Sequence, residues 1–106
     1  MLVPLSELRN AIELMDRELE LYPIWLCPFK LFAQAGMLRS PSNRDEMYVD
    51  IGLYGVPQRD QFDTEKTLRK VEEFVRNIGG FQMMYADSHM TREEFREMFD
   101  HTLYDR

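Results

Sequence analysis

Several features that define common functional classes are scarce or missing in this chain of 106 residues. A single cysteine cannot form an internal disulfide, which excludes a cross-linked secreted scaffold. No apolar run approaches the roughly 20 residues that a membrane-spanning helix needs, and we expect no signal peptide. The 13 Lys and Arg are outnumbered by 19 Asp and Glu and are not concentrated on any predicted element. A surface that follows nucleic-acid phosphates needs such a concentration, so nucleic acid is not an expected partner.

Metal ligands and an activated nucleophile are also missing from the sequence pattern. His89 and His101 are too far apart for a two-histidine helical motif, and Cys27 is remote from both. We therefore predict no metal site. Nucleophilic catalysis by Cys27 would need a neighbouring base, and the sequence places none beside it. A buried, inert thiol is the favoured interpretation.

The composition that remains is typical of one folded domain. Hydrophobic residues make up 44% of the chain and charged residues 30%, which argues against disorder. At this length, residues 1–106 form at most a single domain. The most apolar stretch, Tyr22–Phe29, holds the only tryptophan, the only cysteine and two of the five prolines. We expect it to form part of a buried strand.

Two amphipathic helices are predicted from apolar residues that recur on one face. The first covers about residues 7–20, with Ser6 as its N-cap. The second begins after Asp63 or Thr64. It ends at Gly79-Gly80, because glycine permits the left-handed conformation that stops a helix.

Strands are predicted between and beside these helices. Leu2-Val3-Pro4 is a short strand, and residues 23–31 form a longer one with an irregularity near Pro28. Residues 33–45 form a loop that is long for a hairpin connection. Alternation over Met47–Tyr54 predicts a third strand, and Phe81–Ala86 is short and apolar enough for a buried fourth.

The last predicted helix completes the fold class. Thr91 and Glu94 have the spacing of a capping box, and Met90 and Phe95 that of a hydrophobic staple. The full order is β-α-β-β-α-β-α. Its first six elements match the ferredoxin-like split βαβ pattern, an α+β fold with an antiparallel sheet and helices on one face.

One face of such a sheet needs a partner other than its helices. If the aliphatic side of the third strand meets the helices, then Tyr48, Asp50 and Tyr54 face whatever covers the open side. A carboxylate such as Asp50 within a strand must be solvated, paired or used by a ligand, and all three stay open. The phenols of Tyr48, Tyr54 and Tyr85 could contact a ligand, although buried tyrosines more often bond to backbone.

Both ends of the sequence indicate a fragment of a larger protein. Leu2-Val3-Pro4 is predicted to be a strand that starts at the first residues of the sequence, with no segment leading into it. Tyr104-Asp105-Arg106 has none of the residues that usually follow a helix end.

Five separated stretches, in one order, resemble the C-terminal part of the Δ24-sterol reductases (the 24-dehydrocholesterol reductase, seladin or diminuto family). The stretches are Tyr22-Pro-Ile-Trp-Leu-Cys-Pro-Phe29, Met47–Gly55, Gly80–Asp87, Leu2–Leu5 and Arg92–Asp100, the last followed by Leu103-Tyr104.

The resemblance implies a flavoprotein of the vanillyl-alcohol-oxidase type as the parent. An absent N-terminal domain would bind FAD, and residues 1–106 would be the latter part of the cap domain that shapes the substrate site. The parent would use NADPH and FAD to reduce the C24–C25 double bond of a sterol side chain. An absent N-terminal segment would anchor it to the endoplasmic reticulum membrane. This fragment would be soluble, inactive alone, and partnered by the missing FAD domain.

The resemblance also assigns candidate site residues. An apolar sterol tail needs aromatic and aliphatic walls, and the substrate-binding candidates are Trp25, Tyr48, Asp50 and Tyr54. Tyr85 is the candidate catalytic proton donor. Distant relatives that oxidise sugar-derived substrates carry a His-Trp-Gly-Lys-like stretch where this chain has Met84-Tyr85-Ala86-Asp87. The missing His and Lys suit an alkene, which has no hydroxyl to deprotonate.

Two other functions stay open. The chain could be a free-standing ferredoxin-like binding or dimerisation module, because an open sheet face on a domain-sized chain suits that role. It could also belong to a flavoenzyme of the same fold with a different substrate, such as an alcohol or a sugar lactone.

Overall fold

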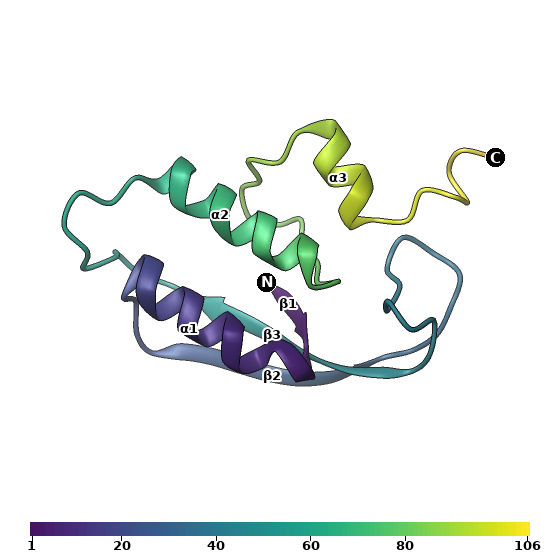
Figure 1. Cartoon of the computed structure of the whole chain (residues 1–106), viewed down its shortest axis with the longest axis horizontal. Helices are drawn as coiled ribbons and strands as arrows, with labels where there is room; N and C mark the ends of the chain where they lie inside the picture. The colour runs from purple at the N-terminus through teal and green to yellow at the C-terminus, as the bar shows by residue number, and fades with distance from the viewer.

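A computed structural model describes residues 1–106 as a three-stranded antiparallel sheet with two long helices on one face (Figure 1). The elements are β1 (Leu2–Pro4), the 3-10 turn η1 (Leu5–Glu7), α1 (Leu8–Leu19), β2 (Ile24–Leu31), β3 (Glu46–Leu53), α2 (Thr64–Asn77) and α3 (Arg92–Met98). β3 lies between β1 and β2. The predicted α+β class, the ferredoxin-like arrangement and the additional C-terminal helix are confirmed.

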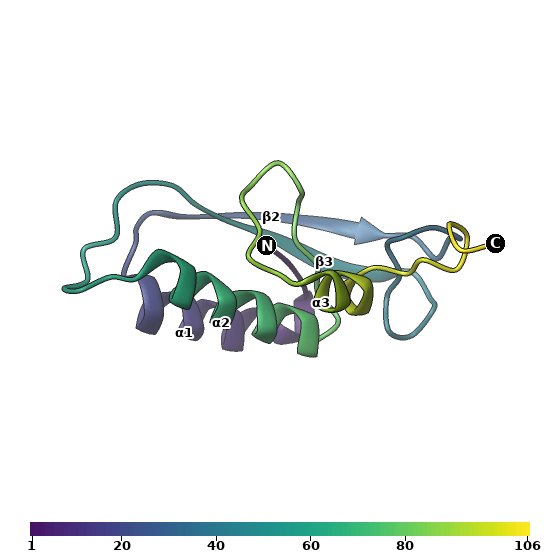
Figure 2. The same cartoon turned by 90° about the horizontal axis from the view of Figure 1, so that it is seen from above.

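The fourth strand is shorter than the sequence predicts. Of Phe81–Ala86, only Phe81 pairs with the sheet, exchanging backbone hydrogen bonds of 2.8 and 2.9 Å with Leu2. Gln82 then leaves the sheet, because its backbone N–H donates to the sulfur of Met98 and its side-chain amide to the carbonyl of Asp87. Residues 82–90 form a loop whose tip lies on the side of the sheet away from α1 and α2 and whose end returns to α2 at Ser88 and His89 (Figure 2).

The main core lies between the sheet and the two long helices. It consists of Val3, Ala11, Leu14, Met15, Leu19, Leu21, Val49, Ile51, Val71 and Val75. The predicted orientation of β3 is confirmed, because Val49 and Ile51 are buried in this core. Met47 stays 42% exposed, since it lies one register position beyond the last β1–β3 pair.

The helix ends follow the predicted caps with one exception. Asp63 accepts a hydrogen bond from the backbone N–H of Lys66 at 2.9 Å, and Gly79 takes a left-handed φ of +74°. The prediction for Ser6 is wrong. Ser6 lies inside the 3-10 turn, so α1 begins after Glu7 and has no side-chain cap.

The opposite face of the sheet is closed at one end, around Tyr48. A second cluster there contains Leu2, Leu31, Tyr48, Phe81 and Phe99. The Tyr48 hydroxyl donates to the carbonyl of Gly79 at 2.8 Å, and burial raises the pKa of Tyr48 to about 12. Tyr48 is fully buried, so the structure does not offer it at the surface with the other site candidates.

Replacement of Tyr48 by phenylalanine tests this closed end. Tyr48→Phe leaves the Gly79 carbonyl without its donor, so we expect the free energy of unfolding at pH 7 to fall by about 1 kcal/mol. The raised pKa also adds stability that is complete below pH 10 and is lost as the pH rises towards 12, because the unfolded state ionises first. Urea unfolding from pH 7 to 12 should show a steeper alkaline loss for the unaltered chain. Tyr104→Phe, at an exposed position, is the control; identical alkaline slopes for both variants would contradict the burial of Tyr48.

Candidate functional site

Three of the predicted site residues meet over Gly52, at the open end of the same sheet face. The Tyr54 and Tyr85 hydroxyls lie 3.3 Å apart. A methyl group on Gly52 would lie 2.9 Å from Tyr54 Cε2 and 3.1 Å from Trp25 Cε3, so both rings pack over the glycine. The side chains remain accessible, with exposed fractions of 51% for Trp25, 68% for Tyr54 and 74% for Tyr85. We call these three residues the aromatic cluster.

The strand register explains how the aromatic cluster forms. Trp25 on β2 pairs directly with Gly52 on β3, and the missing side chain at Gly52 leaves room for an aromatic ring on that face. Tyr54 follows the last residue of β3, and the 82–90 loop supplies Tyr85. Residues from three separate parts of the chain therefore reach one surface.

The electrostatics of the aromatic cluster keep a proton on Tyr85. Its hydrogen bond with Tyr54 raises the pKa of Tyr85, and the negative charge of Asp50 acts in the same direction. The shift widens the pH range over which the phenol keeps its proton, so Tyr85 can donate a hydrogen bond well above neutral pH.

Asp50 lies beside the aromatic cluster and is paired in this chain. Its Oδ1 is 3.6 Å from the amino nitrogen of Met1, which also donates to the carbonyl of Ile51 at 3.0 Å. Burial lowers the pKa of that amino group, and Asp50 partly offsets the effect. Asp50 could be solvated, paired or in contact with a ligand, and in the structure it is ion-paired. Cys27, opposite Asp50 in the β2–β3 register, is a half-buried free thiol.

An apolar cavity of about 420 Å³ adjoins the tyrosine pair. Its walls come from α1, α2, the end of β3, the segment between β3 and α2, and the 82–90 loop. They include Leu19, Ile51, Phe62, Leu68, Met83, Tyr54 and Tyr85. A cavity of this size and lining suits a hydrocarbon group.

A larger cavity, about 520 Å³, lies at the other end of the molecule near α3. Arginines line it, but each is paired with an acid: Arg39 with Asp100 at 2.9 Å, Arg76 with Glu97 at 3.1 Å, and Arg96 with Asp105. None of the predicted site residues lines this cavity. The smaller cavity is therefore the better candidate, because it shares residues with the aromatic cluster.

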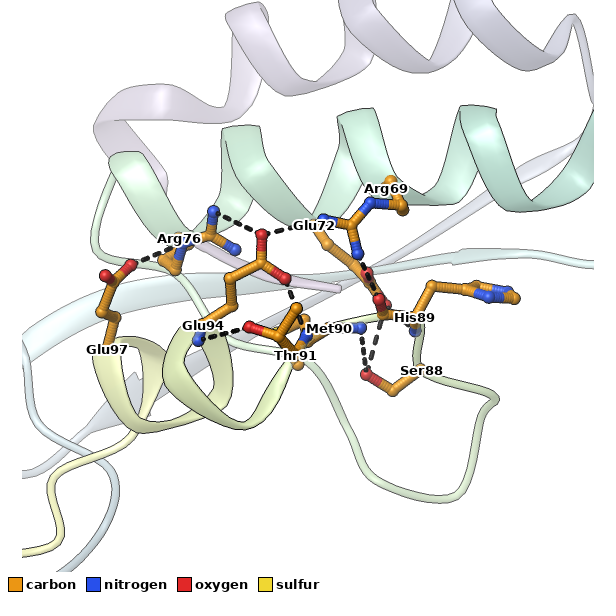
Figure 3. A network of polar contacts seen from close by, with 9 residues as sticks. All are labelled: Arg69, Glu72, Arg76, Ser88, His89, Met90, Thr91, Glu94 and Glu97. Carbon is orange, nitrogen blue, oxygen red and sulfur yellow. Dashed lines mark hydrogen bonds and ion pairs between the residues drawn. The ribbon is translucent and has the colours of Figure 1, made fainter.

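Polar contacts from α2 hold the end of the loop that carries Tyr85 (Figure 3). Glu72 Oε1 accepts from the backbone N–H of His89 at 2.8 Å and from the hydroxyl of Ser88 at 3.3 Å. Arg69 donates to the carbonyl of the same His89. Sequence reasoning missed Glu72, because in Glu72-Glu73 it has the charge and spacing of an ordinary solvent-exposed helix residue.

The start of α3 is fixed by the predicted capping box. Thr91 Oγ1 accepts from the backbone N–H of Glu94 at 3.2 Å, and Glu94 Oε2 accepts from the backbone N–H of Thr91 at 2.7 Å. Glu94 also pairs with Arg69 at 3.0 Å and with Arg76 at 3.6 Å. One carboxylate thus joins the cap of α3 to the side of α2 (Figure 3).

Other classes of site find no counterpart in the structure. The His, Cys, Asp and Glu side chains form no group of three or more that could hold a metal ion. None of the helices combines the length and the apolar character that crossing a membrane requires.

Comparison with known proteins gives relatives of one kind. A Delta(24)-sterol reductase homolog of Caenorhabditis elegans is 52% identical over 99% of this chain. The human Delta(24)-sterol reductase is 48% identical over 98% of the chain, and that of Arabidopsis thaliana is 37% identical over 99%. No family model and no solved structure matches the chain.

These relatives are named as reductases, and reductases are oxidoreductases. The chain is therefore related to enzymes of the oxidoreductase class. Such identities over nearly all of the chain, in animals and a plant, are far above chance similarity. The chain belongs to the Δ24-sterol reductase family. It spans about a fifth of the length of the relatives it matches, 20% of the worm and human proteins and 22% of the plant protein.

Filling the space over Gly52 tests the geometry of the aromatic cluster. In Gly52→Ala the new methyl would collide with the exposed ring of Tyr54, which can swing away. We expect stability to change by less than about 0.5 kcal/mol, the emission of the only tryptophan to shift, and the pKa of Tyr85 to fall towards its ordinary value. In Gly52→Ala/Tyr54→Ala only the 3.1 Å approach to Trp25 remains, so comparison with Tyr54→Ala separates the contact with Trp25 from the collision with Tyr54. Unchanged emission and Tyr85 titration in Gly52→Ala would show that the rings do not pack there.

The pH dependence of stability tests the capping box. The hydrogen bond from the Thr91 backbone N–H, together with Arg69 and Arg76, lowers the pKa of Glu94. Its contribution to stability is therefore present above the ordinary pKa of 4.5 and is lost as the pH falls through the lower folded-state pKa. Glu94→Gln should be less stable at pH 7 and lose less stability on acidification, as measured by thermal unfolding from pH 7 to 3. The same acid slope as the unaltered chain would contradict this role. Glu93→Gln, on the same helical turn, is the matched control.

Proposed function

We propose that this chain forms the substrate-facing part of an FAD-dependent enzyme that reduces the C24–C25 double bond of a sterol side chain. The observation that carries the proposal is the exposed aromatic cluster beside an apolar cavity, in a chain whose relatives bear the name Delta(24)-sterol reductase. A branched hydrocarbon tail offers no hydrogen-bonding groups. Rings and aliphatic side chains are the surfaces that bind it favourably.

Saturation of a carbon–carbon double bond adds a hydride to one carbon and a proton to the other. The flavin, reduced by NADPH, supplies the hydride chemistry when it is bound in the parent protein. Tyr85 supplies the proton, because its phenol is protonated at neutral pH and exposed at the edge of the cavity. Tyr54 holds the Tyr85 hydroxyl by the 3.3 Å contact, and Trp25 provides a flat wall on the other side of Gly52.

The residues of this chain do not themselves fit the diphosphate of FAD. Gly79-Gly80 ends α2 instead of preceding a helix, so its amides do not form the usual phosphate cradle. The arginines near α3 are already paired with carboxylates. We therefore assign FAD binding to the rest of the parent protein, and residues 1–106 to the latter part of its cap domain. A membrane anchor at the endoplasmic reticulum likewise belongs to the proposed parent.

The ion pair between Asp50 and the amino group of Met1 is lost when residues precede Met1. The nitrogen of Met1 is then a peptide N–H, which can still donate to Ile51 but carries no charge. Asp50 loses its ion-pair partner and needs another one. In the parent, Asp50 is thus free to contact the ligand or the domain that covers the open face.

Kinetics of the parent protein test the proposal. Desmosterol reduction by NADPH should fall by at least about 100-fold in Tyr85→Phe, because general acid catalysis is lost. Trp25→Ala should lower kcat/KM by about 10-fold through lost contact with the tail. Tyr104→Phe, far from the aromatic cluster, is the matched control. A normal rate in Tyr85→Phe would remove Tyr85 from the chemistry, and a parent with no sterol reductase activity would defeat the proposed function.

The same exposed face also suits a dimerisation module, in which a second copy covers the aromatic cluster. Sedimentation of the chain separates the two functions. A stable dimer that Trp25→Ala dissociates favours the module. A monomer favours the cap-domain assignment, in which the covering surface lies elsewhere in the parent.

A further inference from the structure

We infer that Glu72 is a positioning residue that fixes the 82–90 loop and thereby holds Tyr85 against Tyr54. The loop has little burial of its own: Met83 through Asp87 are all exposed. Packing therefore cannot determine where Tyr85 lies. Its position must come from the points at which the loop is attached.

The loop is attached at both ends of its exposed part. At the start, the Gln82 side chain donates to the carbonyl of Asp87 at 2.8 Å and closes the loop on itself. At the end, α2 holds both backbone polar groups of His89, with Glu72 accepting from its N–H and Arg69 donating to its carbonyl. The contact to His89 is 2.8 Å, and Glu72 adds the Ser88 hydroxyl at 3.3 Å. Tyr85 lies between these attachments.

Glu72 is an expensive residue for fold stability alone. Its side chain is only 2% exposed, and its second carboxylate oxygen, Oε2, is buried without a hydrogen-bond partner. Burying a carboxylate with an unsatisfied oxygen is unfavourable, and an apolar side chain of similar size at this position of α2 would be buried at lower cost. What Glu72 provides, and an apolar side chain cannot, is an acceptor for the backbone of the loop.

The titration of Tyr85 measures this positioning directly. With 13C-labelled tyrosine, NMR follows the pKa of each of the five tyrosines in the chain. In Glu72→Leu the loop is released and Tyr85 leaves Tyr54, so its raised pKa should fall to the ordinary value near 10. Tyr22 and Tyr104 lie outside the loop and should titrate as before, which general destabilisation would not produce. Glu72→Gln is the matched control, because its amide oxygen can still accept from His89.

If Glu72→Leu does not fold, a second variant tests whether α2 positions the loop. Arg69→Met removes the donor to the His89 carbonyl at a partly exposed position, and we expect a smaller fall of the Tyr85 pKa in the same direction. A Tyr85 pKa that is unchanged in every folded variant lacking a His89 contact would overturn the inference.

The consequence for catalysis rests on the proposed function and is measured separately. In the parent protein, Glu72→Leu should lower kcat for sterol reduction by about 10-fold or more with little change in KM, while Glu72→Gln stays near the unaltered rate. A released loop with full turnover would overturn the catalytic role of Tyr85 but not the positioning by Glu72. A loop that stays in place in Glu72→Leu would overturn the positioning whatever the rate.

Discussion

The sheet is joined through Leu2, which lies between β3 and the segment that returns from α2. Leu2 lies opposite Asp50 of β3 on one side and exchanges two hydrogen bonds with Phe81 on the other. After Phe81 the chain leaves the sheet, because Gln82 bonds to Met98 and Asp87 instead. The tip of the 82–90 loop passes over the face that the helices do not cover (Figure 2), and Tyr85, a residue of this loop, contacts Tyr54 there.

The same face is closed at one end and open at the other for a simple steric reason. At Tyr48, a large side chain fills the space between Phe29 and Phe81, with ring centroids 6.0 and 5.7 Å away, and its hydroxyl is satisfied by Gly79. At Gly52, further along β3, there is no side chain to fill the space. Trp25 and Tyr54 occupy its rim instead and stay partly exposed.

Features that depend on local sequence could be predicted; those that depend on distant contacts could not. Strand alternation in β3, the Asp63 cap and the Thr91–Glu94 capping box follow from residue type and spacing, and the structure confirms them. Tyr48 and Tyr54 belong to the same predicted face, yet Phe81 and Phe99 bury only Tyr48. The early end of the fourth strand depends on Met98 and Asp87, which compete for Gln82. No local pattern reveals such partners.

The candidate site likewise divides into a predictable and an unpredictable part. Aromatic side chains suited to a hydrocarbon could be named from residue type, and three of them do meet. The groups that hold them could not, because Glu72 is buried only once Ser88 and His89 fold back onto α2.

Attachment of the loop by hydrogen bonds to its backbone has a consequence for its side chains. A loop held by burial of its own side chains would hide them, whereas a loop held by its backbone leaves them free to contact something else. Arg69 and Gln82 donate to main-chain carbonyls of the loop, and Glu72 accepts from the main-chain N–H of His89 as well as from the Ser88 hydroxyl. Tyr85 can therefore be both well placed and exposed, a combination that apolar packing alone would not produce.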